Sequence, residues 1–272
     1  MTAAPRLSAA GLQRLRQDLS QRDWAVLKDV DRCRLMTGRQ LQLLHVGEGE
    51  TAARAARRLL LRLTRHGLLA RLERRIGGLR AGSAGYVYAL GPAGVRLLHP
   101  DRPRRRLHEV RDGFLKHTLA LSELYVELRQ AEQQGQLDLL TVETEPRCWR
   151  RLDDGDWLKP DLHLVIGLGE EALHAFVELD QGTEHSSALM GKLRQYEAAY
   201  HGGVAATADV FPRVVWLVPS DRRAAQLRRL VRSPRLTAEL HAVALQSEAL
   251  AALTAGQLDG RPPPADPEDR AD

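Results

Sequence analysis

The order of helix and strand signals in residues 20–90 constrains the fold of this chain more than any other feature. Ser20 is a favourable helix-capping residue, and apolar side chains follow it at helical spacing, so the pattern predicts a helix over about residues 21–32. Thr37 stands three residues before a glutamine, which is the spacing of a capping box. A second, short helix is therefore predicted from Thr37 to Gly47.

A third helix is predicted from about Glu50 to Gly67, with one apolar side and one arginine-rich side. The arginines on that second side are Arg54, Arg57, Arg58, Arg62 and Arg65. After Gly67 the sequence indicates a strand, a glycine-rich tip that holds Arg80, and a returning strand from Tyr86. This part of the chain therefore predicts three helices followed by a two-stranded hairpin.

Three helices and a hairpin in this order are typical of a winged helix-turn-helix domain. In that arrangement the third helix enters the DNA major groove, and the hairpin tip follows the backbone or the minor groove. The alternative is that the arginines form an ordinary solvated helix face. The charged helix, its position and the basic hairpin agree with one another, so we expect this half to bind double-stranded DNA. The base sequence cannot be inferred, because arginine contacts both phosphate and guanine.

The net charge of +5 is the sum of two halves of opposite sign. Residues 1–112 contain 23 Lys and Arg against 10 Asp and Glu, a net of +13, which leaves 17 against 25, or −8, for residues 113–272. Halves that share one core seldom separate charge in this way, so two domains are favoured. The predicted parts are an N-terminal extension (1–18), a winged-helix domain (19–98), a basic linker (99–112), a second domain (113–255) and a disordered tail (256–272). The linker carries three arginines expected to contact phosphate: Arg104, Arg105 and Arg106.

Several classes of protein are excluded. The apolar stretches are short, so no segment approaches the ~20 residues of a membrane helix. The N-terminal residues have no apolar region typical of a secretory signal. Cys33 and Cys148 are too few for a disulfide scaffold and unsuited to a zinc site, so both are expected to be buried thiols. The expectation is a cytoplasmic protein with no membrane partner.

The second half predicts a mixed α/β sheet, and the whole chain an α+β fold of two domains. The predicted order is helix, three strands, helix, strand and helix, over residues 113–134, 139–142, 158–166, 172–180, 186–200, 214–218 and 221–232.

Three carboxylates lie on the second and third of these strands. Asp161 follows a Lys-Pro pair, and Glu178 and Asp180 are two residues apart, so their side chains should point to one face of a strand. Acids that converge in an apolar sheet repel one another unless a cation or a solvent-filled cleft relieves them. We therefore predict that Asp161, Glu178 and Asp180 bind Mg²⁺ or Mn²⁺, whose preferred ligands are oxygens. The alternative is a set of separate, exposed acids at strand ends.

These acids resemble the site of the PD-(D/E)XK, or restriction-endonuclease-like, superfamily. In that superfamily a Pro-Asp pair and an acid-x-Lys pair hold a divalent metal against a scissile phosphate. Asp180 occupies the position of the superfamily's lysine, so the cation must come from elsewhere. Two substitutes are Lys159 and Lys192; Lys192 shares a helix face with Tyr196 that could reach the acids. Glu123 on the first helix could add a fourth carboxylate, and His163 is expected to be a strand neighbour rather than a ligand.

A second resemblance extends over most of the chain, from about residue 19 to residue 218. The chain is similar to the replication-relaxation family associated with bacterial plasmids, in which a basic winged-helix half precedes a segment like the second half here. The matching motifs are His-Thr-Leu at His117, Lys-Pro-Asp at 159–161, Glu-x-Asp-x-Gly-Thr-Glu at 178–184 and Lys-x-x-x-Tyr at 192–196. The resemblance implies a role in plasmid replication and in relaxation of plasmid DNA.

Three functions follow from these readings. The favoured one is a duplex-DNA-binding protein of the plasmid replication and relaxation type, with a nuclease-like second domain that is not necessarily active. The second is a Mg²⁺-dependent endonuclease or nickase in which Asp161, Glu178, Asp180 and Lys192 are catalytic. The third is a winged-helix transcription regulator whose acidic half senses a ligand or dimerises. Homodimerisation stays open in all three.

Overall fold

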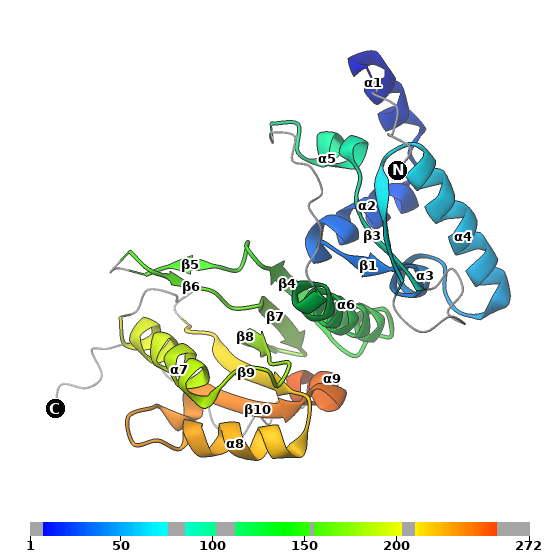
Figure 1. The fold of residues 1–272 in the computed structure, drawn as a ribbon. Helices are drawn as coiled ribbons and strands as arrows, with labels where there is room; N and C mark the ends of the chain where they lie inside the picture. The colour runs from blue at the N-terminus through cyan, green and yellow to red at the C-terminus, as the bar shows by residue number, and fades with distance from the viewer. Residues whose placement is uncertain (1–7, 76–84, 102–111, 153–154, 203–209, 255–272) are drawn as a thin grey trace. The chain divides into compact units, whose positions relative to one another are not determined.

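The structure is a computed structural model that describes residues 8–75, 85–101, 112–152, 155–202 and 210–254 (Figure 1). The chain has an α+β fold, as the sequence predicts, and divides into two compact units, Met1–Val126 and Glu127–Asp272. None of the described helices is long and apolar enough to cross a lipid bilayer. Three groups of residues with predicted roles lie outside the described ranges: Arg80, the linker arginines Arg104, Arg105 and Arg106, and the tail from residue 256.

The helices of the first unit begin where the sequence provides caps. They are α1 (Ala9–Asp18), α2 (Gln21–Cys33), α3 (Gly38–His45) and α4 (Gly49–Arg65). Ser20 and Asp23 form a capping box at α2, and Thr37 and Gln40 form another at α3. Gly47, with a φ of 104°, turns the chain between α3 and α4, in a conformation that favours glycine.

A three-stranded antiparallel sheet completes the first unit. β1 (Met36–Thr37) pairs with β3 (Tyr86–Leu90), and β3 pairs with β2 (Leu69–Arg75). The hairpin β2–β3 follows α4 directly, and α5 (Pro92–Leu98) follows β3 (Figure 1). The core of this unit takes apolar residues from the helices and the sheet, including Val26, Leu27, Val30, Leu60, Leu63 and Val87.

The first part of α6 (Asp112–Gln133) belongs to the first unit. Leu115 and Leu119 lie in one buried cluster with Leu35 and Val87. The division between the units therefore falls inside α6, on the C-terminal side of the predicted linker.

The second unit is built on a five-stranded mixed sheet. Its strands are β4 (Asp138–Thr144), β7 (Leu162–Leu168), β8 (Glu171–Leu179), β9 (Arg213–Val218) and β10 (His241–Leu245), in the spatial order β10-β9-β8-β7-β4. The pairs β10–β9 and β9–β8 are parallel, and β8–β7 and β7–β4 are antiparallel. The predicted mixed sheet is thus confirmed.

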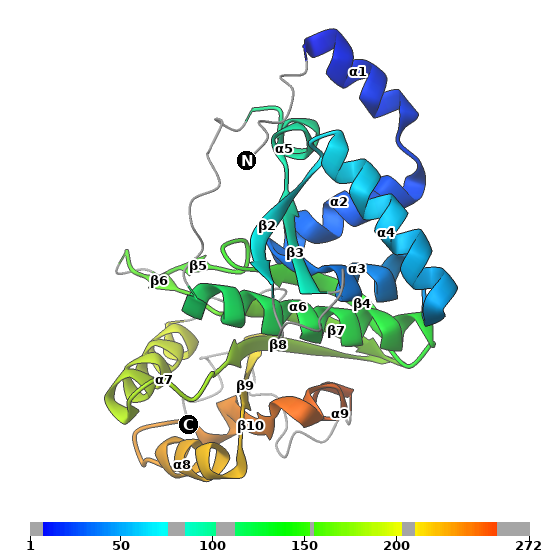
Figure 2. The same cartoon turned by 45° about the vertical axis from the view of Figure 1, so that its right-hand side comes forward.

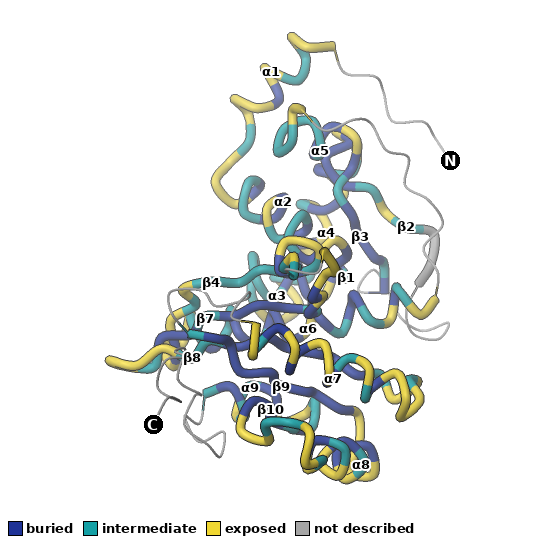
Figure 3. Tube along the Cα trace, turned by 90° about the vertical axis from the view of Figure 1, so that its left-hand side faces the viewer, coloured by how far each residue is buried: buried dark blue, intermediate teal, exposed yellow. Residues whose placement is uncertain are grey.

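Two helices cover one face of this sheet (Figure 2). They are α7 (Ser186–His201) and α8 (Asp221–Val231), and α9 (Ala249–Thr254) follows β10. Phe176 and Trp216 of the sheet pack in one buried cluster with Leu189 and Leu193 of α7 and Leu227 of α8. Every residue of β9 is buried, so both faces of the sheet are covered there (Figure 3).

The strand predicted over residues 158–166 is divided in two in the structure. β6 (Trp157–Leu158) pairs with β5 (Arg150–Arg151) in a separate two-stranded ribbon, and β7 begins only at Leu162. Pro160 lies between them and has no N–H to donate to a sheet ladder, which accounts for the interruption. Asp161 is thereby placed just before β7.

Candidate functional site

The antiparallel pairing of β7 with β8 brings two of the predicted acids together. Leu162 is paired with Val177, so continuing the register by one residue places Asp161 opposite Glu178. Asp161 is held in this position by its own backbone, whose N–H donates to the Val177 carbonyl at 3.1 Å. Its side chain is fixed as well, because Oδ2 accepts a 2.8 Å hydrogen bond from the Leu179 N–H.

Glu178 is 2% exposed and is held by two side chains of α7. The Tyr196 hydroxyl donates to Oε1 at 2.6 Å, and Lys192 Nζ donates to Oε2 at 3.1 Å. Lys192 and Tyr196 are four residues apart, so one face of α7 presents both groups to the sheet. The predicted approach of this helix face to the acids is therefore present in the structure.

Burial and a neighbouring carboxylate change the acidity of Glu178. Burial favours the neutral form and, together with the negative charge of Asp161, raises the pKa of Glu178 from 4.5 to about 7. Lys192 and Tyr196 oppose this shift because they stabilise the charged form. Burial alone would lower the pKa of Lys192, but the negative charges of the neighbouring carboxylates raise it above its ordinary value.

Glu184 is a further carboxylate of the site that the sequence pattern did not single out. Its Oε1 lies 3.1 Å from Lys192 Nζ, so one ammonium group bridges Glu178 and Glu184. The available signal was its place as the last acid of the Glu-x-Asp-x-Gly-Thr-Glu motif. The group that the structure assembles is therefore Asp161, Glu178, Glu184, Lys192 and Tyr196.

Asp180 does not join this group through its side chain. Its carboxylate accepts from Arg223 of α8, with Nε at 2.5 Å from Oδ2 and a second guanidinium nitrogen at 3.0 Å from Oδ1. Both side chains are buried, and the Gly182 N–H adds a 3.0 Å hydrogen bond to Oδ1. Arg223 also donates to the Glu184 carbonyl at 2.8 Å, so the pair fixes the turn that positions Glu184.

The expected metal ligands are thus not arranged as a three-carboxylate cluster. In the part of the chain that the structure describes, no group of three or more His, Cys, Asp and Glu side chains is placed to hold a metal ion. Asp180 is neutralised by Arg223, and both oxygens of Glu178 already accept hydrogen bonds. Binding of Mg²⁺ or Mn²⁺ by Asp161, Glu178 and Asp180 stays a prediction.

Three other predicted residues make contacts of their own. Glu123, expected as a fourth carboxylate, belongs to the first unit, where it accepts a 2.6 Å hydrogen bond from Gln40. Lys159 places its Nζ 5.2 Å from the centre of the Trp149 ring. His163 is a strand neighbour, as expected, and its Nδ1 lies 3.2 Å from Glu143 and from Arg150.

The five predicted DNA-binding arginines of α4 all lie on its exposed side. The opposite side buries Ala56, Leu60 and Leu63 in the core. The exposed arginines are Arg54, Arg57, Arg58, Arg62 and Arg65. The helix therefore presents apolar residues inward and cations outward, as its sequence pattern predicts.

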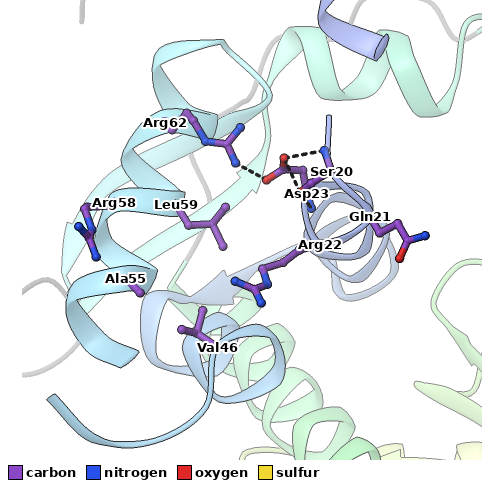
Figure 4. Close-up of a pocket in the computed structure, with 9 residues that line it drawn as sticks. All are labelled: Ser20, Gln21, Arg22, Asp23, Val46, Ala55, Arg58, Leu59 and Arg62. Atoms are coloured by element: carbon purple, nitrogen blue, oxygen red, sulfur yellow. Dashed lines mark hydrogen bonds and ion pairs between the residues drawn. The ribbon is translucent and has the colours of Figure 1, made fainter. Parts of the chain in front are cut away.

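Two of these arginines are engaged in ion pairs. Arg54 contacts Glu50 at 2.9 Å on the exposed surface. Arg62 contacts the buried carboxylate of Asp23 at 2.5 Å, which ties α4 to the start of α2. Arg58 and Arg62 also line an open pocket whose other wall includes Arg22, a cation that the sequence analysis missed (Figure 4). The signal for Arg22 was its place in the first turn after the Ser20 cap.

Both thiols are buried and free, as predicted. Burial raises the pKa of Cys33 and of Cys148, so neither is suited to nucleophilic chemistry.

Comparison with known proteins identifies one relationship. The family model described as replication-relaxation matches residues 27–214, from α2 to β9. No curated protein and no solved structure matches the chain. The match covers more than half of the 272 residues. The chain therefore belongs to the replication-relaxation family.

Proposed function

We propose that this protein binds double-stranded DNA through its first unit, which acts as a winged helix-turn-helix domain in plasmid replication or DNA relaxation. The element order α2-β1-α3-α4-β2-β3, with β1 paired to β3, supports this assignment. In such domains the helix before the hairpin enters the major groove, and here that helix is α4. Family membership agrees with a role in replication or relaxation.

The observation that carries the proposal is the arginine face of α4. Five arginines lie on the exposed side of one helix of 17 residues, while its other side is part of the core. Phosphate contacts of this kind supply most of the affinity of proteins for duplex DNA and make it strongly dependent on salt. Arg57 and Arg58 are the most informative pair, because Arg54 and Arg62 are engaged by Glu50 and Asp23.

The test is duplex binding by the variant Arg57→Ala/Arg58→Ala, measured by fluorescence anisotropy at several salt concentrations. Each lost phosphate contact lowers the slope of log affinity against log salt by ~0.9, so two contacts should lower it by about 2. The matched control is Arg222→Ala/Arg229→Ala, which removes the same charge from exposed positions of α8. An unchanged slope in the α4 variant, or an equal loss in the control, would contradict the proposal.

A second candidate function is hydrolysis of the DNA backbone by the second unit. The observation that favours it is the position of Lys192. Its ammonium group donates a hydrogen bond to Glu178 and also interacts electrostatically with Asp161. The PD-(D/E)XK resemblance requires a lysine beside two acids, and Lys192 provides it from α7 although Asp180 replaces the motif lysine. The catalytic group in this candidate is Asp161, Glu178 and Lys192, with Asp180 as a residue that positions the adjoining turn.

Incubation of supercoiled plasmid with the full chain and Mg²⁺ or Mn²⁺ tests this second function. Open circles should form with the wild-type protein and should be lost in Glu178→Gln and Lys192→Ala. The control is Arg194→Ala, an exposed cation on the same helix that should retain activity. Supercoils that persist with both metals would eliminate the hydrolytic function while leaving duplex binding intact.

A further inference from the structure

The ribbon formed by β5 and β6, with the residues that flank it, carries two tryptophans and two cations at alternating positions. Arg151 is paired with Trp157, and continuing that antiparallel register places Trp149 opposite Lys159. Directly opposed residues share a face, and so do residues two apart in one strand. Trp149, Arg151, Trp157 and Lys159 therefore occupy the same face of the ribbon, while Leu158 is buried on the other.

The exposure of Trp157 has no explanation in the packing of this unit. Its side chain is 47% exposed, and it is one of three large apolar residues exposed in the described part of the chain. Leu158 beside it is 1% exposed and joins the core cluster with Phe176 and Tyr196, so the ribbon is already anchored without Trp157. An exposed indole is a surface that can stack on planar groups.

Each cation of this face lies beside one of the two indoles. Lys159 Nζ lies 5.2 Å from the centre of the Trp149 ring, and Arg151 is exposed directly across from Trp157. Within the described part of the chain, Arg151 forms no ion pair. A base can stack on the exposed indole while its phosphate contacts the adjacent guanidinium, which is the general manner in which proteins hold unpaired nucleic acid.

The ribbon leads directly into the carboxylate group. Asp161 is the fourth residue after Trp157, a distance of at most ~13 Å along an extended chain. We propose that this aromatic-basic face, Trp149, Arg151, Trp157 and Lys159, binds an unpaired DNA strand and holds it beside Asp161 and Glu178. The proposal rests on the DNA-binding function above and adds the form of DNA that the second unit takes.

The test uses the full chain with two fluorescein-labelled probes, a single-stranded oligo-dT and a random-sequence duplex. Trp157→Ala and Arg151→Ala should each weaken oligo-dT binding roughly five-fold or more, as loss of one stacking or charged contact does in other single-strand binders. Trp157→Phe should restore much of the affinity because it retains a ring. The matched control is Leu140→Ala, which removes another exposed apolar side chain of the same unit.

The duplex probe separates this proposal from the function proposed above. Duplex affinity should be unchanged in Trp157→Ala and reduced in Arg57→Ala/Arg58→Ala. Three results, each with duplex binding retained, would overturn the strand-binding face alone. They are a wild-type oligo-dT affinity in Trp157→Ala, no oligo-dT binding by the wild-type chain, and an equal loss of oligo-dT affinity in Leu140→Ala. Loss of the proposed duplex function would appear instead as absent duplex binding by the wild-type chain. Equal thermal unfolding midpoints for the variants establish that the ribbon remains folded.

Discussion

The Tyr196 hydroxyl donates a 2.6 Å hydrogen bond to Glu178 inside the second unit, where both side chains are almost fully buried. Because Glu178 is only 2% exposed, a water molecule is a poor replacement for this donor. Tyr196→Phe should therefore reduce the free energy of unfolding by about 1–3 kcal/mol, the cost of leaving a buried polar group unsatisfied. It should also raise the pKa of Glu178 further, because the hydroxyl stabilises the charged form.

The measurement is urea-induced unfolding of the two proteins at one pH above neutrality. Tyr200→Phe is the matched control on the same helix, since Tyr200 is half-buried and its hydroxyl has no hydrogen bond to a described residue. An equal loss of stability in both variants would show that the Glu178 contact has no special weight.

Glu178 should also make stability depend on pH. Its pKa is raised from 4.5 to about 7 in the folded chain, so the folded state binds a proton that the unfolded state has released between these values. Unfolding then releases a proton, and stability falls as pH rises from about 4.5 to about 7. Unfolding free energies measured across this range should show the decline in the wild type and a flatter curve in Glu178→Gln. Parallel curves for the two proteins would contradict a raised pKa.

The ion pair between Asp180 and Arg223 makes a third prediction. Both side chains are more than nine-tenths buried, so removal of either partner leaves a charge without compensation. Arg223→Ala should lower the free energy of unfolding by about 3–5 kcal/mol. The double variant Asp180→Ala/Arg223→Ala should lose less than the sum of the two single variants, because the orphaned charge is gone. Strict additivity in this thermodynamic cycle would mean that the pair has no coupling.

Local sequence signals predicted the helices and the contact between α7 and the acids. Ser20 and Thr37 marked the starts of α2 and α3, because a cap is a property of a few adjacent residues. Lys192 and Tyr196 could be placed on one face because helical period fixes that relationship within a single segment. Their contact with Glu178 then followed from one further assumption, that α7 packs on the sheet.

Relationships between distant segments could not be predicted in the same way. Asp180 was expected to face a metal, but its partner Arg223 lies 43 residues later and reaches it only through the packing of α8. Glu123 lies on an amphipathic helix whose pattern does not reveal which unit it packs against. In the structure it accepts a hydrogen bond from Gln40 of the first unit. The strands β5, β6 and β10 are short, and their two to five residues give no clear alternation.

The contact between Gly91 and Gly67 makes the last prediction, which concerns the base of the β2–β3 hairpin. A Cβ atom at Gly91 would lie 2.2 Å from the Gly67 carbonyl oxygen and 2.9 Å from the Leu69 carbonyl carbon. Both are backbone atoms, and the Gly91 N–H donates a 2.8 Å hydrogen bond to the Leu68 carbonyl, so the chain cannot move aside without losing pairing. Gly91→Ala should destabilise the first unit by at least about 1–3 kcal/mol, the usual cost of overpacking. It should also weaken duplex binding, because the displaced hairpin follows directly from α4.

Gly113→Ala in α6 is the matched control, since nothing lies within 4 Å of its added methyl group and alanine favours a helix. Thermal unfolding and duplex anisotropy measured on both variants should separate them, and wild-type stability in Gly91→Ala would show that the close approach of the two backbones is not required.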